Sequence, residues 1–140
     1  MDLVNVGTDK LSEFWPEVRG LLHSALEYSG GRFSEKSILD CILTGEMQLW
    51  VVMDGIDIIS VFVTNIMNYR TGLRVCDIIL LSGNNMVKWL PDCTDRISEW
   101  ASQIGCTKIQ MMGRPGWEKA LKNWGKISVA MERSVGEYHG

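Results

Sequence analysis

The part of the chain that follows Val75 constrains the fold most, because short apolar runs alternate there with amphipathic helical patterns and almost no linker residues. Two segments repeat apolar side chains every three or four positions, which predicts helices over Trp89–Ile104 and Trp117–Trp124. Three apolar runs have the length of buried strands; they are Val75–Leu81, Thr107–Met112 and Ile127–Met131. We expect the first two strands to be parallel neighbours, joined through the first helix by a right-handed crossover.

The first half of the chain predicts its own series of elements. A strand over Asp2–Val6 precedes a helix that the cluster Tyr28-Ser29-Gly30-Gly31 stops. A second helix begins after the N-cap Ser34 and ends at Gly45. The hairpin signal Asp54-Gly55 then joins two β-rich runs; they are Met47–Met53 and Ile58–Met67. The full order, β-α-α-β-β-β-α-β-α-β, predicts an α/β (α+β) class with a mixed, mostly antiparallel sheet and about four flanking helices.

Length and composition predict one compact domain. The chain has 140 residues, 46% of them hydrophobic, and no Pro- or Ser-rich linker divides it, so we expect a domain over residues 1–135 and a frayed tail over 136–140. The net charge is −3 and the 14 Lys and Arg residues are scattered, which argues against nucleic acid as a partner. No apolar run is long enough to span a membrane and the N-terminus lacks a signal pattern, so a soluble cytoplasmic protein is expected.

The cysteines and histidines are too dispersed to predict a metal centre or a thiol active site. No C-x-x-C pair occurs, and His23 and His139 lie in the first predicted helix and in the tail. We expect the cysteines to be small apolar core residues or bystanders, with a reactive nucleophile as the alternative; they are Cys41, Cys76, Cys93 and Cys106. Neither a Cys/His or Ser/His/Asp enzyme nor a metal cofactor is expected.

Several short motifs, spread over most of the chain, carry a resemblance to a known family. They are Leu49–Gly55 (LWVVMDG) before the strand at Ile58, Trp100–Cys106 (WASQIGC), and Gly113–Trp117 (GRPGW) with Asn123–Gly125 (NWG). Together with the predicted element order, they make the chain resemble the GNAT superfamily of acetyl-CoA-dependent N-acetyltransferases, and more narrowly the small GNAT-like proteins of bacteriophages and prophages. The resemblance implies a GNAT-like fold, located in the cytoplasm of a bacterial host or in a virion.

The resemblance also implies where acyl-CoA would bind. In this superfamily the strand that corresponds to Val75–Leu81 splays away from a neighbour, the pantetheine amides add to its edge, and the pyrophosphate lies on N–H groups at the start of the following helix. The corresponding residues here are Leu81, Ser82, Gly83, Asn84 and Asn85. Family members commonly carry Gln or Arg followed by x-x-Gly-x-Gly or x-x-Gly-x-Ala, whereas this chain keeps one glycine and has bulky Met86, Val87 and Trp89 nearby. Acetyl-CoA binding is therefore left open, and we expect one of these bulky side chains to fill the cleft.

Few titratable groups are available for acetyl transfer, which needs a base for the ammonium group and an acid for the departing thiolate. Asp77 is the candidate base, acting through a water molecule, and a solvated carboxylate without a catalytic role is the alternative. The last predicted helix begins with Trp117 rather than with a tyrosine, and Tyr138 lies in the tail. Arg114 is the candidate contact for an anion or a protein partner, unless its Gly-Arg-Pro-Gly turn only connects two elements.

The six tryptophans predict core packing more than ligand stacking. Trp100, Trp117 and Trp124 fall on apolar helix faces, so we expect them to be mostly buried. Trp15 and Trp89 are less constrained, because the first is offset from the apolar stripe of its helix and the second adjoins a loop.

Two functions remain open at this point. In the first, a phage-type GNAT-like protein with a degenerate acyl-CoA motif and weak or lost N-acetyltransferase activity acts by binding a virion or host protein, with a homo-oligomer as a further alternative. In the second, the protein is an active acetyl-CoA-dependent N-acyltransferase that acts on an unidentified amine. The single glycine and the missing acid favour the first, and the fold alone does not decide between them.

Overall fold

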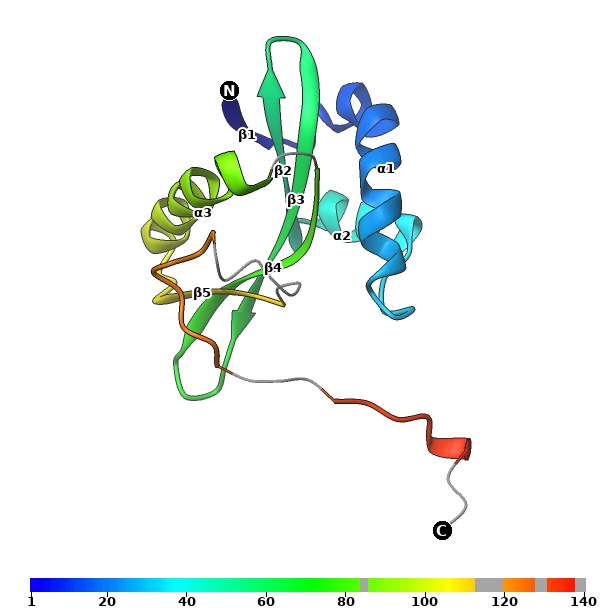
Figure 1. Ribbon diagram of the computed structural model, residues 1–140, viewed down its shortest axis with the longest axis vertical. Coiled ribbons are helices and arrows are strands. Elements are labelled where there is room, and N and C mark those ends of the chain that lie inside the picture. Colours follow the sequence, from blue (N-terminus) through cyan, green and yellow to red (C-terminus); the bar gives the residue numbers. More distant parts are fainter. Residues whose placement is uncertain (84–85, 113–119, 128–130, 138–140) are drawn as a thin grey trace.

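The computed structural model describes residues 1–83, 86–112, 120–127 and 131–137, with the backbone alone for residues 86 and 87 (Figure 1). The elements in chain order are β1 (Asp2–Val6), α1 (Leu11–Glu27), α2 (Glu35–Thr44), β2 (Met47–Asp54), β3 (Asp57–Asn68), β4 (Arg74–Gly83), α3 (Met86–Gln103) and β5 (Lys108–Met111), followed by the short 3-10 helix η2 (Val135–Glu137). This order agrees with the predicted one as far as β5.

The five strands form one sheet in the order β1-β2-β3-β4-β5. The first four strands pair antiparallel, whereas β4 and β5 are parallel, with Val75 opposite Lys108 and Ile78 opposite Met111. Parallel neighbours need a crossover connection, and α3 supplies it. The prediction of a mixed, mostly antiparallel sheet in which these two strands are parallel neighbours is confirmed.

Local sequence signals explain where α2 begins and ends. The Ser34 hydroxyl accepts the N–H of Ser37 at 3.1 Å, and the Ser37 hydroxyl accepts the N–H of Ser34 at 2.9 Å, so two otherwise free helix donors are satisfied. Gly45 ends the helix in the left-handed region at φ 84°, which an L side chain rarely adopts. Both predicted ends of this helix are confirmed.

Helices cover the two faces of the sheet and create two cores (Figure 1). Alternate strand side chains enter opposite cores, because successive residues of a strand point to opposite faces. The core on the α3 side contains Trp50, Val52, Phe62, Cys76, Ile78, Leu81, Trp89, Leu90, Cys93 and Ile97. The core on the side of α1 and α2 contains Val18, Leu22, Ile38, Leu49, Val51, Val61, Val63 and Leu80.

Three of the four cysteines belong to the α3-side core, as expected for small apolar side chains. Burial raises the pKa of Cys76 to about 12 and that of Cys93 to about 11, and Cys106 is buried beside them. The fourth, Cys41, is half-buried, and its pKa is also raised, by burial and by the nearby Glu46 carboxylate. A raised pKa keeps a thiol protonated, which is the opposite of what a catalytic nucleophile requires.

Trp89 is more constrained than its sequence context suggests. The helix α3 begins at Met86 rather than at Trp89, so Trp89 lies on its inner face, where it is 3% exposed and its ring meets Phe62 edge to face at 5.7 Å. Trp100 and Trp124 pack against the same core but stay half-buried, and Trp100 meets Trp50 edge to face at 5.1 Å. Trp117 lies outside the described residues.

The two last predicted elements differ from the structure. Residues 117–119 of the predicted helix Trp117–Trp124 lie outside the described residues, and Ala120–Trp124 form turns instead of helix. Residues 128–130 of the predicted strand Ile127–Met131 are not described either, while its ends, Ile127 and Met131, are outside any strand and 79% and 92% exposed. An apolar pattern of two turns is too short to hold a helix by itself, and a strand needs a partner edge. The described chain thus has three α-helices where about four were expected.

Candidate functional site

The clearest opening in the described sheet lies between β4 and β5. Their pairing covers only Val75–Ile78 and Lys108–Met111, yet β4 continues to Gly83. From Ile79 to Gly83 the strand pairs with β3 alone, so its other edge carries backbone N–H and C=O groups with no strand partner among the described residues. We call this arrangement the fork; its base lies at Ile78 and Met111.

A β-bulge stands at the base of the fork. The register between β3 and β4 shifts there, with Thr64 opposite Ile78 and Val63 opposite Leu80, so Ile79 is the extra residue. Both Ile79 and Leu80 consequently pack toward the core of α1 and α2. A bulge bends its strand and increases the twist, which accounts for the point at which β4 leaves β5.

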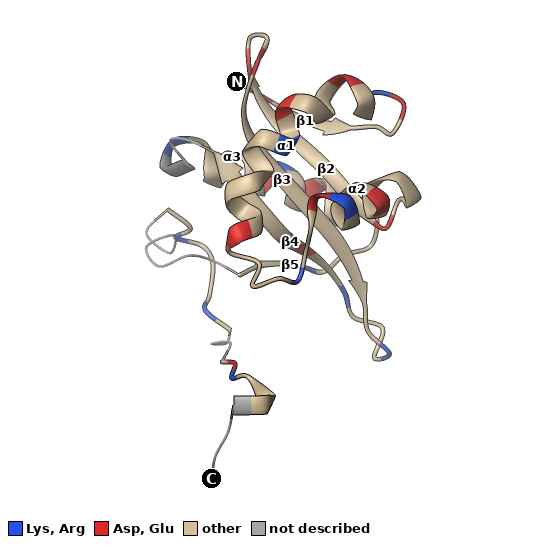
Figure 2. Cartoon of the chain, turned by 90° about the vertical axis from the view of Figure 1, so that its right-hand side faces the viewer, with Lys and Arg blue, Asp and Glu red and all other residues tan. Residues whose placement is uncertain are grey.

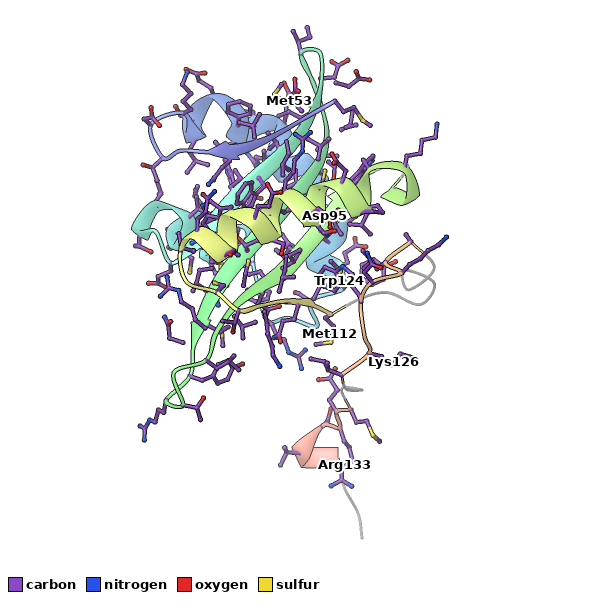
Figure 3. All side chains as sticks on the ribbon, turned by 90° about the vertical axis from the view of Figure 1, so that its left-hand side faces the viewer. Met53, Asp95, Met112, Trp124, Lys126 and Arg133 are labelled. Atoms are coloured by element: carbon purple, nitrogen blue, oxygen red, sulfur yellow. The ribbon has the colours of Figure 1, made fainter. Side chains whose placement is uncertain are left out.

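A hollow of about 90 Å³ lies at the base of the fork. It is bordered by β4, by the end of β5 and by the C-terminal end of α1; the lining residues are Ile78, Ile79, Leu80, Leu81, Met111, Met112, Ala25, Tyr28 and Ser29. Because strand side chains point to both faces, a hollow that touches four consecutive residues of β4 must run along the strand edge, beside the unpaired backbone. Figure 3 labels Met112, which marks the β5 side of this place.

Asp77 lies next to the hollow rather than in its wall. Its neighbours Cys76 and Ile78 enter the α3-side core, so Asp77 points to the opposite face, the face on which Ile79 lines the hollow roughly 7 Å farther along the strand. Gln110 stands opposite Asp77 on β5 and hydrogen-bonds to its carboxyl. Burial raises the pKa of Asp77, and the hydrogen bond from Gln110 partly offsets this rise. A carboxylate with a raised pKa is a better proton acceptor than a solvated one.

The predicted cofactor residues fall into three groups. Leu81 is buried against the α3-side core and also lines the hollow. Ser82 is buried and joined to α1 through a contact of 2.9 Å between its hydroxyl and that of Ser24, while its carbonyl accepts the Ser60 hydroxyl at 2.7 Å. Asn84 and Asn85 lie outside the described residues, as does Arg114, so their predicted contacts stay predictions.

Gly83 has a reason to be glycine that does not involve a ligand. A Cβ at this position would lie 2.6 Å from the Cβ of Ser60 and 2.8 Å from the carbonyl oxygen of Ile59. Real Cβ atoms do not come so close to backbone, so the packing of β4 on β3 requires a residue without a side chain here. The single glycine of the motif is therefore explained by the fold, whatever its part in binding.

The start of α3 offers positive charge close to the open end of the fork. The helix begins at Met86, just beyond the end of β4, and its first turn contains no acidic residue. Lys88 lies in that turn and is exposed. A lysine at the positive end of a helix dipole is unfavourable unless an anion balances it. Figure 2 shows basic and acidic positions interspersed along the backbone of the described elements on the side that faces the viewer.

The hollow brings in two residues that the sequence reasoning missed as functional candidates. Tyr28, interpreted only as part of a helix stop, lines the hollow with its side chain 71% exposed. Ala25, one turn earlier in α1, lines it from a buried position. No local signal identifies them, because the hollow forms only when the end of α1 meets strands that follow it by about fifty residues.

The predicted filling of the cleft by Met86, Val87 or Trp89 stays a prediction. The Trp89 ring packs on Phe62 of β3 and is absent from the lining of the hollow, and the side chains of Met86 and Val87 lie outside the described set. Within the described residues, no group of three or more His, Cys, Asp and Glu side chains is placed to hold a metal ion. No helix in that part of the chain has the length and apolar character needed to cross a membrane.

Comparison with solved structures finds acetyltransferases that superpose over almost the whole chain. A structure described as a predicted acetyltransferase with acetyl-CoA, from Clostridium acetobutylicum, has a TM-score of 0.69 at 13% identity, and the match covers 99% of this chain and 99% of that chain. An aminoglycoside acetyltransferase from an uncultured soil metagenomic sample, in complex with sisomicin, has a TM-score of 0.69 at 11% identity, covering 96% and 95%. An aminoglycoside N-acetyltransferase in complex with CoA has a TM-score of 0.67 at 16% identity, covering 96% and 94%.

No protein-family model matches the sequence, and no curated protein sequence does either. At identities of 11% to 16%, the structural likeness concerns the fold and leaves the site residues to be argued from this chain alone. The narrower resemblance to phage proteins finds no counterpart among these structures. What is established is architectural: this chain has the fold of the GNAT acetyltransferases over nearly its full length.

Proposed function

We propose that this protein is an acyl-CoA-dependent N-acyltransferase that binds its acyl donor in the fork between β4 and β5. The proposal rests on the edge of β4 that has no strand partner among the described residues and that ends at the hollow. An extended ligand with amide groups can add to such an edge as a further strand would, and the pantetheine arm of CoA is a ligand of this kind. The start of α3, with Lys88 and without acidic side chains, suits the phosphate end.

The dimensions of the fork fit this assignment. From Gly83 to Ile79 the open edge spans roughly 13 Å at the usual rise of a strand, and it leads from the start of α3 to the hollow. A donor whose charged end lies at α3 therefore has its thioester end at the base of the fork. That is where Asp77 and Tyr28 lie, on the side of the sheet that α1 covers.

Bound acyl-CoA would supply an activated acyl group, whose transfer forms an amide C–N bond as the thioester C–S bond breaks. One proton must leave the amine and one must reach the sulfur. We assign the first to the Asp77 carboxylate, acting through water, because burial has raised its pKa toward the working range of a base. We assign the second to the hydroxyl of Tyr28, the phenol that lines the hollow.

A second candidate function is binding of a protein partner, with acyl transfer weak or lost. An apolar groove of about 380 Å³ between the start of α1 and α2 favours it; its lining includes Leu11, Trp15, Pro16, Leu39 and the 55% exposed Leu43. A phage or host protein as partner, and the cofactor motif with its single glycine, enter this hypothesis from the sequence alone. We place it second because, among the described residues, no strand pairs with β4 on its β5 side beyond Ile78, and the Trp89 ring packs on Phe62 and does not line the hollow.

Calorimetric titration with acetyl-CoA and with CoA separates the two candidates. We expect micromolar binding, weakened about tenfold in Lys88→Ala, since a charge-assisted hydrogen bond contributes roughly 1.5–3 kcal/mol. Lys36→Ala is the matched control, because Lys36 is an exposed helical lysine that pairs with Asp40 on its own helix, α2. If neither acetyl-CoA nor CoA binds, the result favours the partner-binding function.

Release of free thiol from acetyl-CoA in the presence of amines, including sisomicin, tests the chemistry. We expect Asp77→Asn to lower the rate by about 10²- to 10⁴-fold while leaving donor affinity unchanged, as is usual for loss of a general base. An unaltered rate in this variant would remove Asp77 from the mechanism. An unchanged rate in Tyr28→Phe would do the same for Tyr28.

A further inference from the structure

We propose that the hollow at the base of the fork is an acyl pocket that selects a donor with a three- or four-carbon chain, such as propionyl- or butyryl-CoA, over acetyl-CoA. The inference rests on the proposed function, because it concerns the group carried at the thioester end of the donor. It adds the substrate class, which neither the fold nor the structural neighbours specify.

The lining of the hollow is apolar where it meets the strands. Ile79 and Leu80 border it from the bulge of β4, Met111 and Met112 from the end of β5, and Ala25 from α1. None of its lining residues carries a charged side chain. An ammonium group placed there would lose its hydration without a counter-ion in the wall, since Asp77 stands beside the hollow and not in its lining, whereas an acyl chain would lose only contact with water. The hollow therefore suits the acyl chain rather than the amine acceptor.

The volume of the hollow sets the length of chain. An apolar protein cavity of about 150 Å³ accommodates the six carbons of benzene, which corresponds to roughly 25 Å³ per carbon. The hollow of about 90 Å³ then holds about three or four carbons. An acetyl group would leave about half of this space empty, and apolar side chains would lose packing contacts on that side.

Two side chains limit the space in the hollow. Ala25 is 3% exposed on the inner face of α1, so its small size leaves room that a larger residue would fill. Met112 is 78% exposed on the opposite side, and an unbranched, flexible thioether can close over chains of different length. Ala25 thus limits the hollow on the α1 side, and we take the exposed side at Met112 as its mouth.

Titration of the unmodified protein with acetyl-, propionyl-, butyryl-, hexanoyl-CoA and free CoA tests the proposal. Each buried methylene is worth about 0.8 kcal/mol, so the dissociation constant should fall by about fourfold per carbon up to butyryl and then level off or rise. Equal affinity for all four thioesters would overturn the acyl pocket and leave the proposed function standing. Failure of every thioester and of CoA to bind would overturn both.

Two variants test which side chains produce the preference for longer acyl chains. Ala25→Leu should abolish the gain from acetyl to butyryl while free CoA binds as before, because the added side chain occupies the hollow. Since a buried substitution can also impair folding, Met112→Ala at the exposed mouth is the second variant, and it should reduce the gain per carbon at least twofold. Met53→Ala is the matched control, because Met53 lies on β2, away from Met112 (Figure 3). Full retention of the chain-length preference in both variants would overturn the assignment.

Discussion

The two halves of β4, which meet at the bulge at Ile79, differ in their pairing. From Val75 to Ile78 the strand is paired on both sides, with β3 and with β5, and its side chains are mostly buried. From Ile79 to Gly83 its one strand partner among the described residues is β3. The first half has the pairing of an inner strand, whereas the second half has the pairing of an edge strand, on which the proposed donor site depends.

The open half is held in place by packing instead of by a second ladder. Leu81 stands opposite Phe62 on β3, and Phe62 is covered by the ring of Trp89 from α3. At the strand end, Ser60 donates its hydroxyl to the Ser82 carbonyl and leaves no room for a side chain at Gly83. A helix and a neighbouring strand can thus hold a strand in place along a stretch where the described chain gives it no second strand partner.

Among the substitutions that test the difference between the two halves of β4, Trp89→Ala should lower the free energy of unfolding most. Loss of a large buried aromatic side chain typically costs about 3–5 kcal/mol, and here it would remove the cover of the open half. Urea unfolding measures the loss, and Trp15→Ala, at a half-buried position by the surface groove, should cost less. If Trp89→Ala instead kept its stability and bound acetyl-CoA more tightly, Trp89 would be a plug of the fork, as the sequence suggested.

Gly83→Ala should have the next largest effect, a destabilisation of about 1–3 kcal/mol. The new methyl group would overlap Ser60 and the Ile59 carbonyl oxygen, so β4 or β3 must shift. Gly20→Ala is the matched control, because that glycine is in α1 with open space around it, and the change should be neutral or stabilise by about 0.5–1 kcal/mol. Thermal unfolding of the two variants side by side gives the comparison. Equal stability of both would mean that Gly83 is not required by the fold.

Sequence reasoning located the strands and helices up to β5 because their signals are local. Ser34 as a helix cap, Gly45 as a helix stop and Asp54-Gly55 as a hairpin turn act on their immediate neighbours, and the structure confirms each. The alternation of side chains along β2 and β3 likewise reports burial on two faces. The segments beyond β5 carry the same kind of signal, but Ala120–Trp124 are not helical, because packing against the rest of the molecule decides such short elements.

The site was predictable only in part, since its residues meet through tertiary contacts. Asp77 was a candidate from its strand alone, and its sequence neighbour Ile78 lines the hollow, but its role as a base stays a prediction. Its raised pKa depends on burial and on Gln110 of another strand, which no local pattern reveals. Tyr28 and Ala25 join the site from α1, and the bulge at Ile79 follows from a register shift against β3. Gly83 suggested phosphate binding from the sequence, while its close packing against Ser60 explains why the fold itself requires a glycine there.

Hydrogen exchange compares the two halves of β4 directly. Some backbone N–H groups between Ile79 and Gly83 face the fork and have no strand partner in the described part of the chain. This segment should therefore contain amides that exchange at least tenfold faster than those of Val75–Ile78, a difference of about 1.4 kcal/mol. Addition of CoA should slow exchange in the open half and leave the other half unchanged. Protection of both halves to the same extent without ligand would mean that the edge is already covered, contrary to the fork.

The smallest effect should be the stabilisation produced by Asp77→Asn, and it should depend on pH. Burial raises the pKa of Asp77 above its ordinary value of 3.8, so the folded state holds this proton more tightly than the unfolded state. The contribution of Asp77 to stability is therefore fully present below pH 3.8 and is lost as the pH rises through the raised pKa. Near pH 7 the neutral amide should unfold at higher urea than the wild-type carboxylate, and the difference should vanish in acid. A variant that is more stable than wild type at neutral pH and inactive would show that the buried carboxylate at the base of the fork is kept for chemistry, whereas a less stable variant would make Asp77 a structural partner of Gln110.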